Sequence, residues 1–358
     1  VTGAGELKTK PTQHSVKELR SLGIQPDILI CRSSKPIPQD MCEKMAMFCD
    51  VDADAVFQNL TARSIYEVPV LLEKQGLDEV VLRKLDVDAT DHPLDMAEWH
   101  DMVERMLKDY DRKVTLGVVG KYVELQDSYI SLTEALRHAA MANEANLDIK
   151  WINAELVEEG EIDLEAELKD VDCILVPGGF GSKGLEGKIS AIKYARENKV
   201  PFFGICLGMQ CAVVEYARHI GMTGANTTEA NAETAYPVID ILPDQQDVEE
   251  KGSMRLGLYP CKVAAGSLTE KAYGEALIYE RHRNRYEVNN AYREELEKNG
   301  LVIAGALPNG RLVEIVELPT DVHPWFMGVQ FHPELKSRPT NPHPLFRDFI
   351  AAALKEQK

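Results

Sequence analysis

The chain has 358 residues, of which 44% are hydrophobic and 27% are charged, a composition typical of globular proteins that are long enough for two domains. Its formal net charge of −18 disfavours nucleic-acid binding, because contact with the phosphate backbone needs clustered Lys and Arg side chains. No apolar run approaches the roughly 18 residues of a membrane span, and no signal peptide opens the sequence, so we expect no membrane segment.

The first 92 residues predict an incomplete α/β domain. A helix is expected from about residue 14 to 22, with Gly23 as its stop. The segment 26–31 (PDILIC) predicts a buried strand, because its apolar residues follow one another without alternation. Further elements are expected as a helix over 39–48, a strand over 55–58 and a helix over 64–75. Two short strands do not form a stable sheet alone, so we expect the rest of this sheet to lie outside the given sequence.

An acidic segment with one amphipathic helix, residues 93–112, is predicted to link this region to a second domain over residues 113–358. The second domain opens with an apolar strand that ends at Gly120, followed by a helix over about 127–145. Strands that alternate with helices are then expected at 147–154, 171–179 and 200–206. This alternation predicts a doubly wound, largely parallel sheet. More turn-rich segments predict antiparallel strands beside that sheet at 259–267, 301–319 and 325–332.

The most informative motif is Gly-Ile-Cys-Leu-Gly at residues 204–208, between an apolar strand and a helix-like segment. This is the strand–turn–helix context of a nucleophile elbow with cysteine in place of serine. The bend requires glycine on both sides, and the amide N–H groups at the helix start favour a thiolate on Cys206. A buried, inert sulfur is the alternative, and it is what we expect of the other cysteines. Seven cysteines without paired spacing or a CxxC motif predict a reducing, cytoplasmic location and no structural zinc site.

A nucleophilic thiol needs a base, and the base needs a group that orients it. The segment GVQFHPE supplies His332 and Glu334, two residues apart at a strand end, where their side chains share a face. Glu334 is expected to hold His332 in one tautomer and to stabilise its imidazolium form. A surface turn is the alternative for His-Pro-Glu alone, but its pairing with the cysteine elbow favours a catalytic pair.

Two loops suggest anion binding. The glycine-rich VPGGFG segment at 176–181 follows a strand, and its N–H groups can bind a developing oxyanion together with the amide after the cysteine. The adjoining GFGSKGLEGK is not a P-loop, because Ser182 occupies the first glycine position and Ile189 follows the lysine. Near the N-terminus, Lys8 and Lys10 in KTKPTQ place two ammonium groups close together, which suits a triphosphate. Solvated surface is the alternative for these lysines.

Together, these motifs resemble the CTP synthase family over essentially the whole chain. The C-terminal half is similar to a class I glutamine amidotransferase domain, on PGGFG, GICLGMQ and FHPE. Three other stretches are specific to CTP synthases: residues 5–33, MRLG at 254–257 and ERHRNRYEVNN at 280–290. The resemblance implies that residues 1–92 are the C-terminal part of a P-loop-type amidoligase domain. The ATP-binding P-loop and the magnesium-binding acidic residues of that domain are then expected outside this sequence.

The resemblance implies a ligase that converts UTP to CTP with ATP and Mg²⁺, using ammonia released from glutamine. Cys206 attacks the glutamine carboxamide, and the N–H groups of Gly179 and Leu207 bind the oxyanion. His332, held by Glu334, protonates the departing ammonia and then activates water. The resemblance assigns glutamine recognition to Gly179, Gln210, Glu229 and Arg285. No metal ligand is expected within this chain.

Nucleotide binding is implied in the same way. Positions that bind UTP, or CTP as feedback inhibitor, at a subunit interface of a homotetramer correspond to Lys8, Lys10, Gln13 and Lys44. GTP is expected to activate the enzyme near Phe180. Two alternatives stay open: a glutaminase subunit that serves another synthetase, and a catalytically silent interaction module that keeps only the fold.

Overall fold

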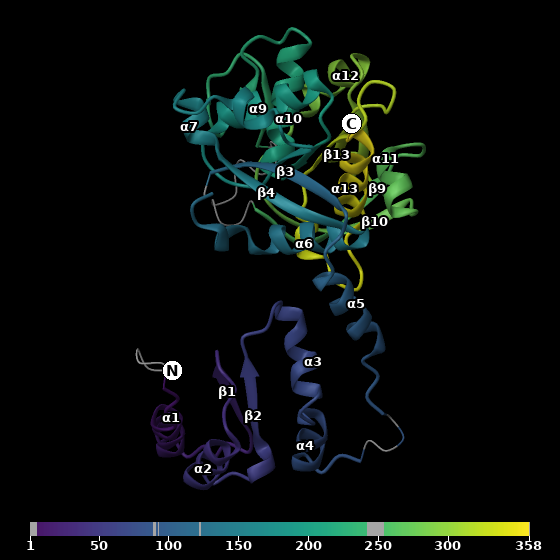
Figure 1. Cartoon of the computed structure of the whole chain (residues 1–358). Helices are drawn as coiled ribbons and strands as arrows, with labels where there is room; N and C mark the ends of the chain where they lie inside the picture. Colours follow the sequence, from purple (N-terminus) through teal and green to yellow (C-terminus); the bar gives the residue numbers. More distant parts are fainter. Residues whose placement is uncertain (1–5, 89–90, 92, 122, 242–253, 358) are drawn as a thin grey trace. The chain divides into compact units, whose positions relative to one another are not determined.

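The computed structural model describes residues 6–88, 91, 93–121, 123–241 and 254–357 (Figure 1). The chain divides into two compact units, residues 1–108 and 109–358. No helix in the described part of the chain is both long enough and apolar enough to cross a membrane.

Within its described residues, the first unit has a two-stranded parallel sheet and five α-helices. The strands are β1 (Leu29–Ser33) and β2 (Val56–Leu60). The helices are α1 (Lys10–Ser21), α2 (Gln39–Cys49), α3 (Val68–Glu73), α4 (Leu77–Lys84) and α5 (Ala97–Leu107), with the 3₁₀ turns η1 (Ala53–Ala55) and η2 (Ile65–Glu67). The amphipathic helix expected within residues 93–112 is α5, and it belongs to this unit.

Two expectations for the first unit are wrong in detail. Helix α1 begins at Lys10, four residues before the expected start, and Pro11 lies in its first turn. Proline fits there because the first turn does not need its missing N–H group. Strand β1 is not buried throughout, because Ile30 is 52% exposed while Leu29 is buried. One face of this strand therefore lacks cover within the unit.

The second unit is built around a mixed sheet that has nine strands among the described residues, in the order β10-β9-β12-β13-β14-β6-β5-β3-β4. The run from β14 to β4 is parallel, and the run from β10 to β14 is antiparallel. The strands are β3 (Arg112–Gly120), β4 (Ala145–Asn153), β5 (Cys173–Val176), β6 (Phe202–Ile205), β9 (Arg255–Val263), β10 (Leu277–Asn284), β12 (Val302–Ala306), β13 (Val313–Glu317) and β14 (Phe326–Val329). A parallel core with antiparallel strands beside it is what the sequence predicts.

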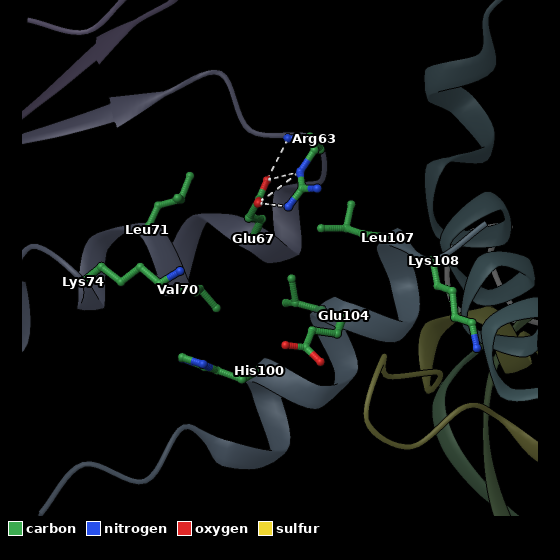
Figure 2. Close-up of a pocket in the computed structure, with 10 residues that line it drawn as sticks. Arg63, Glu67, Val70, Leu71, Lys74, His100, Glu104, Leu107 and Lys108 are labelled. Carbon is green, nitrogen blue, oxygen red and sulfur yellow. Dashed lines mark hydrogen bonds and ion pairs between the residues drawn. The ribbon is translucent and has the colours of Figure 1, made fainter.

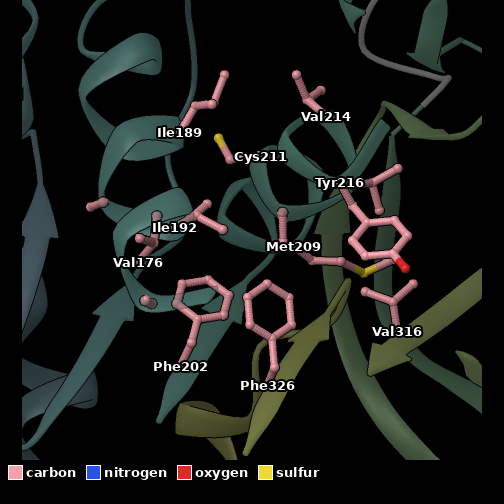
Figure 3. Close-up of a cluster of buried hydrophobic side chains, with 14 of the residues drawn as sticks. Val176, Ile189, Ile192, Phe202, Met209, Cys211, Val214, Tyr216, Val316 and Phe326 are labelled. Carbon is pink, nitrogen blue, oxygen red and sulfur yellow. The ribbon is translucent and has the colours of Figure 1, made fainter. Parts of the chain in front are cut away.

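Helices cover both faces of this sheet. Its strands alternate their side chains, so neighbouring phenylalanines enter opposite cores. Phe202 packs with residues of α9 and α10, as Figure 3 shows, and Phe203 packs with residues of α6 and α13. The helices of this unit are α6 (Ile130–Ala142), α7 (Ala154–Glu158), α8 (Leu164–Leu168), α9 (Leu185–Asn198), α10 (Leu207–His219), α11 (Leu268–Tyr273), α12 (Asn290–Lys298) and α13 (Pro344–Glu356). The remaining elements among its described residues are η3 (Gln126–Tyr129), η5 (Pro333–Leu335) and a small sheet of β7 (Asn226–Thr227), β8 (Pro237–Asp240) and β11 (Glu287–Val288).

Strand β14 joins the two halves of the large sheet. The sequence predicts only antiparallel pairing for the segment 325–332, but β14 pairs antiparallel with β13 and parallel with β6. The carboxyl ends of β6 and β14 therefore meet at the same sheet edge, which is where ligand sites form in open α/β sheets. Cys206 follows β6 directly, and His332 lies just beyond β14.

Candidate active site

Cys206 occupies a strained bend between β6 and α10. Its φ is 53° and its ψ is −106°, a conformation that non-glycine residues rarely adopt. A Cβ on Gly204 would lie 2.7 Å from the carbonyl oxygen of Gly208, and a Cβ on Gly208 would collide with the carbonyl oxygen of Val176. Both flanking glycines are thus required by close backbone approach. The backbone N–H of Cys206 also donates to the carbonyl of Val329 at 2.7 Å, which fastens the bend to β14.

His332 and Glu334 form a hydrogen-bonded pair at the end of β14. Nδ1 of His332 lies 2.8 Å from Oε1 of Glu334, and the two side chains are only 15% and 14% exposed. Burial alone would lower the pKa of His332, but the neighbouring side chains of Cys206 and Glu334 outweigh it and raise this pKa to about 10. The Nε2 atom is buried and hydrogen-bonds to no described residue. This nitrogen is therefore available to exchange a proton at the site.

Gly178, in the loop after β5, lies against the side chains of both Cys206 and His332. A Cβ at this position would stand 2.9 Å from Cε1 of His332 and 3.4 Å from Cβ of Cys206. Any larger residue here would push the imidazole away from the thiol. The ends of three adjacent parallel strands, β5, β6 and β14, thus bring a backbone loop, a thiol and an imidazole together.

The two residues expected to form the oxyanion hole are neighbours. A Cβ on Gly179 would lie 3.4 Å from Cδ2 of Leu207, so the loop after β5 rests on the first residue of α10. The first N–H groups of a helix have no partner within that helix and carry its positive dipole. The amide of Leu207 is one of these groups, and it follows the sulfur directly in the chain.

The residues expected to recognise glutamine lie on segments next to this loop. Glu229 is half-buried, and its Oε1 accepts the backbone N–H of Gly181 at 2.9 Å. Gln210 is buried, and its Nε2 donates to the carbonyl of Tyr286 at 2.9 Å. Arg285, half-buried, precedes this tyrosine.

Phe180, expected near the GTP site, is 48% exposed. The guanidinium carbon of Arg283 lies 5.5 Å from the centroid of its ring, a distance that allows a cation–π contact. The structure therefore places Phe180 directly after Gly179 in the loop that follows β5, with Arg283 from the end of β10 over its ring.

One residue at the sulfur is absent from the sequence-based set. Gln330 is fully buried, and its Nε2 lies 3.7 Å from Sγ of Cys206. It also accepts a hydrogen bond from Nε2 of Gln210 at 3.1 Å. The signal was available in the GVQFHPE motif, where a polar residue sits among apolar neighbours two positions before the histidine.

The stretches MRLG and ERHRNRYE interlock in a buried charge network. Arg255 bonds Glu287 at 2.9 Å and Glu314 at 2.7 Å, and Nε2 of His282 lies 2.6 Å from Glu314. Burial alone would raise the pKa of Glu314, but its hydrogen bonds and its attraction to His282 and Arg255 lower it. This network holds β10 and β13 beside the segment that carries Arg285. The two stretches are separate in the sequence but contact each other in the fold, through the ion pair between Arg255 and Glu287.

The residues expected to bind UTP or CTP lie in the first unit. Lys8 and Lys10 flank Thr9, the residue before α1, and both are exposed, as is Lys44 on α2. Gln13 is half-buried and donates from Nε2 to Oγ1 of Thr9 at 3.2 Å. Helices α1 and α2, which carry Lys10, Gln13 and Lys44, pack against each other.

A separate pocket of about 350 Å³ lies in the first unit, between the η2–α3 segment and α5 (Figure 2). An ion pair between Arg63 and Glu67, with an N–O distance of 2.6 Å, marks one end. None of the expected site residues lines it. Among the described residues, no group of three or more His, Cys, Asp or Glu side chains is placed to hold a metal ion.

Comparison with known proteins identifies the family. The family model for glutamine amidotransferase class-I matches residues 124–352, and the model for the CTP synthase N-terminus matches residues 1–87. CTP synthase of Clostridium kluyveri is 57% identical over 356 residues, covering 99% of this chain and 65% of that protein. CTP synthase of Pelotomaculum thermopropionicum is 58% identical over 354 residues, covering 98% of this chain and 65% of that protein.

One solved structure is also similar to this chain. The glutaminase domain of Trypanosoma brucei CTPS with bound acivicin matches with a TM-score of 0.62 and 38% identity, covering 68% of this chain and 95% of that one. The chain thus spans about two thirds of the length of the curated relatives it matches. The chain belongs to the class-I glutamine amidotransferase family, and it is similar to CTP synthases in both its N-terminal and its C-terminal region.

Proposed function

We propose that this chain is the glutamine-hydrolysing part of a CTP synthase. The observation that carries the proposal is the nucleophile elbow at Cys206 on the end of β6, next to the His332–Glu334 pair beyond the adjacent parallel strand β14. A thiol, an imidazole and an orienting carboxylate are the groups that a cysteine nucleophile requires.

In the first half-reaction, the thiolate of Cys206 attacks the carboxamide carbon of glutamine and forms a C–S bond. The carbonyl oxygen becomes an oxyanion, which accepts hydrogen bonds from the N–H groups of Gly179 and Leu207. The C–N bond then breaks, and His332 gives its Nε2 proton to the leaving nitrogen, so that ammonia departs and a glutamyl thioester remains. The raised pKa of His332 keeps the imidazole protonated for this step at neutral pH.

In the second half-reaction, water hydrolyses the thioester. Neutral His332 accepts a proton from the attacking water, and the hydroxide oxygen forms the new C–O bond. Breaking the C–S bond returns the thiolate and releases the γ-carboxylic acid, which gives its proton to solvent and becomes glutamate, while the first water proton stays on His332. Glu334 stabilises the imidazolium in both halves through its hydrogen bond to Nδ1.

Glutamine recognition is proposed for Gly179, Gln210, Glu229 and Arg285. The substrate carries a free ammonium and a free carboxylate, so Glu229 and Arg285 supply one counter-charge for each. Two contacts support this proposal. Glu229 accepts a hydrogen bond from Gly181, in the loop that carries Gly179, and Gln210 contacts Tyr286, the neighbour of Arg285.

The activity of the whole enzyme is also a proposal, since the chain spans 65% of its relatives. The proposed reaction is the amination of UTP, which depends on ATP and Mg²⁺. We further propose that CTP inhibits the enzyme, that GTP activates it near Phe180, and that it forms a homotetramer. We assign UTP or CTP binding to Lys8, Lys10, Gln13 and Lys44, and we assign no ATP or Mg²⁺ ligand to the described residues. A cytoplasmic location is supported by seven cysteines that form no disulfide.

The test of glutaminase function is release of glutamate from glutamine. The Cys206→Ala variant should lose at least about 10³-fold in rate, because no other group can form the thioester. Cys31→Ala, in the first unit, should keep the wild-type rate. A glutamine-analogue electrophile should add to the wild type at Cys206 alone, as seen by intact and peptide mass spectrometry. An adduct that persists in Cys206→Ala would refute the assignment.

The alternatives predict different outcomes. A silent interaction module releases no glutamate. A glutaminase subunit of another synthetase releases glutamate, but UTP and CTP then give Lys8, Lys10 and Lys44 no protection from acylation. Protection of these three lysines, with the exposed Lys17 on α1 as the unprotected control, would support nucleotide binding in the first unit.

A further inference from the structure

A buried chain of hydrogen bonds ends on the sulfur of Cys206. It begins at the backbone carbonyl of Tyr286, which accepts from Nε2 of Gln210 at 2.9 Å. The same Nε2 donates to Oε1 of Gln330 at 3.1 Å, and Nε2 of Gln330 donates to Sγ of Cys206 at 3.7 Å. Gln210 is 4% exposed and Gln330 is fully buried, so solvent water does not compete for these contacts.

The direction of this chain follows from its first member. A backbone carbonyl can only accept, so Gln210 must turn its NH₂ group toward Tyr286. That NH₂ group also faces Gln330, which must therefore present its oxygen there. The NH₂ group of Gln330 is left to face the sulfur. An amide flip at Gln330 would set two NH₂ groups against each other, so the donor at Cys206 is fixed by chemistry two residues away.

We propose that Gln330 stabilises the thiolate of Cys206 by donating a hydrogen bond to it, and that Gln210 is the positioning residue that sets the orientation of Gln330. The proposal rests on the function proposed above and adds a member to its catalytic set. A thiol can give its proton to the carbonyl of Arg283, 3.9 Å from Sγ, whereas a thiolate can only accept. The Gln330 contact is therefore stronger in the charged form, and the Arg283 contact exists only in the neutral form.

The charged and titratable groups around the sulfur stay the same when Gln330 is changed to Met. His332, with Glu334 behind it, lies beyond β14. Arg283 lies at the end of β10, with its guanidinium over Phe180, and the N-terminus of α10 supplies amide groups. A shift measured in Gln330→Met then reports the lost amide donor.

The experiment is the pH dependence of alkylation of Cys206 by iodoacetamide in the full chain, followed by peptide mass spectrometry. Gln330→Met removes the donor and keeps the length of the side chain. We expect its alkylation midpoint to move to higher pH by about one unit, which is about a tenfold slower reaction below the midpoint. Gln330→Glu should shift the midpoint further, because a carboxylate repels the thiolate.

Two controls separate this effect from a loss of packing. Met327→Ala opens a cavity in β14, where Met327 is fully buried, and should lower the melting temperature without moving the midpoint. Gln210→Leu keeps the amide donor of Gln330 but removes the hydrogen bond that orients it. This variant should raise the midpoint by less than Gln330→Met does. If Gln330→Met does not fold, the Gln210→Leu shift decides the question, because that variant adds no charge beside the sulfur.

An unchanged midpoint in the folded Gln330 variants would overturn the proposal, as would a wild-type Cys206 that iodoacetamide does not reach. Alkylation needs no glutamine, so this result is independent of the glutaminase assay. A shifted midpoint without glutamate release would uphold the role of Gln330 and refute the proposed function. Glutamate release with an unchanged midpoint would support the proposed function and refute the role of Gln330.

Discussion

The two units differ in how much apolar surface they bury for themselves. In the second unit, two large cores lie on opposite faces of the central sheet, and every residue of the strands β5, β6, β13 and β14 is buried. In the first unit, the described residues form two small cores, one around Met45 and one around Phe57. Several large apolar side chains of this unit remain exposed, among them Leu22 at 77%, Met47 at 71% and Phe48 at 55%.

This difference explains where the candidate catalytic groups lie. A strained residue such as Cys206 persists only where the surrounding structure holds it in place, and the second unit has the core to do so. Small cores leave little free energy to offset the conformational entropy of folding. We therefore expect substitutions at matched positions to cost much more in the second unit than in the first.

The largest effect is expected at the elbow. Gly208→Ala places a Cβ against the carbonyl of Val176 in β5, and should lower the free energy of unfolding of the second unit by about 3 kcal/mol or more. Gly23→Ala in the first unit meets no atom within 4 Å and bears only the strain of its φ of +82°, about 1 kcal/mol. Urea unfolding measures both. Equal costs would contradict the required close approach at the elbow.

Acid should destabilise the second unit through two buried histidines. Burial lowers the pKa of both His138 and His323 to about 4. The unfolded chain then binds more protons than the folded one between about pH 6.5 and 4, so the free energy of unfolding falls as the pH falls through this window. The loss approaches about 3 kcal/mol for each histidine.

Urea unfolding at a series of pH values tests this expectation. The double variant His138→Gln, His323→Gln should show a flatter pH dependence of the free energy of unfolding between pH 6.5 and 4. His14→Gln, at an exposed position of the first unit, is the matched control and should follow the wild type. A wild-type second unit with no loss of stability over this range would refute the prediction.

The smallest effect is expected on the strand of the first unit. Ile30→Thr changes a side chain that is 52% exposed on β1, and should alter the free energy of unfolding by no more than about 0.5 kcal/mol. The same substitution at Ile174, fully buried on β5, should cost about 3 kcal/mol because it buries a hydroxyl and loses packing. A large cost at Ile30 would show that its exposed face is covered in solution.

The local chemistry of the site is readable in the sequence. The two glycines around Cys206 predict a bend that only glycine allows, and the structure confirms the collision that a Cβ would cause at each. The spacing of His332 and Glu334 predicts a hydrogen-bonded pair, and their side chains are in contact at 2.8 Å. Both features are decided by residues within a few positions of one another, where backbone geometry leaves few options.

Tertiary pairing decided the rest. The parallel register of β14 beside β6 brings His332 to Cys206 across more than a hundred residues, whereas local pattern predicts only an antiparallel strand there. The donor at the sulfur depends on Gln330, Gln210 and the carbonyl of Tyr286, which no local spacing connects. Exposure of Ile30 likewise depends on what packs over β1, because a run of apolar residues specifies a strand but not its cover. Sequence determines what each segment can do, and long-range packing determines which segments meet, because contact energies across a sheet depend on partners that are distant in the chain.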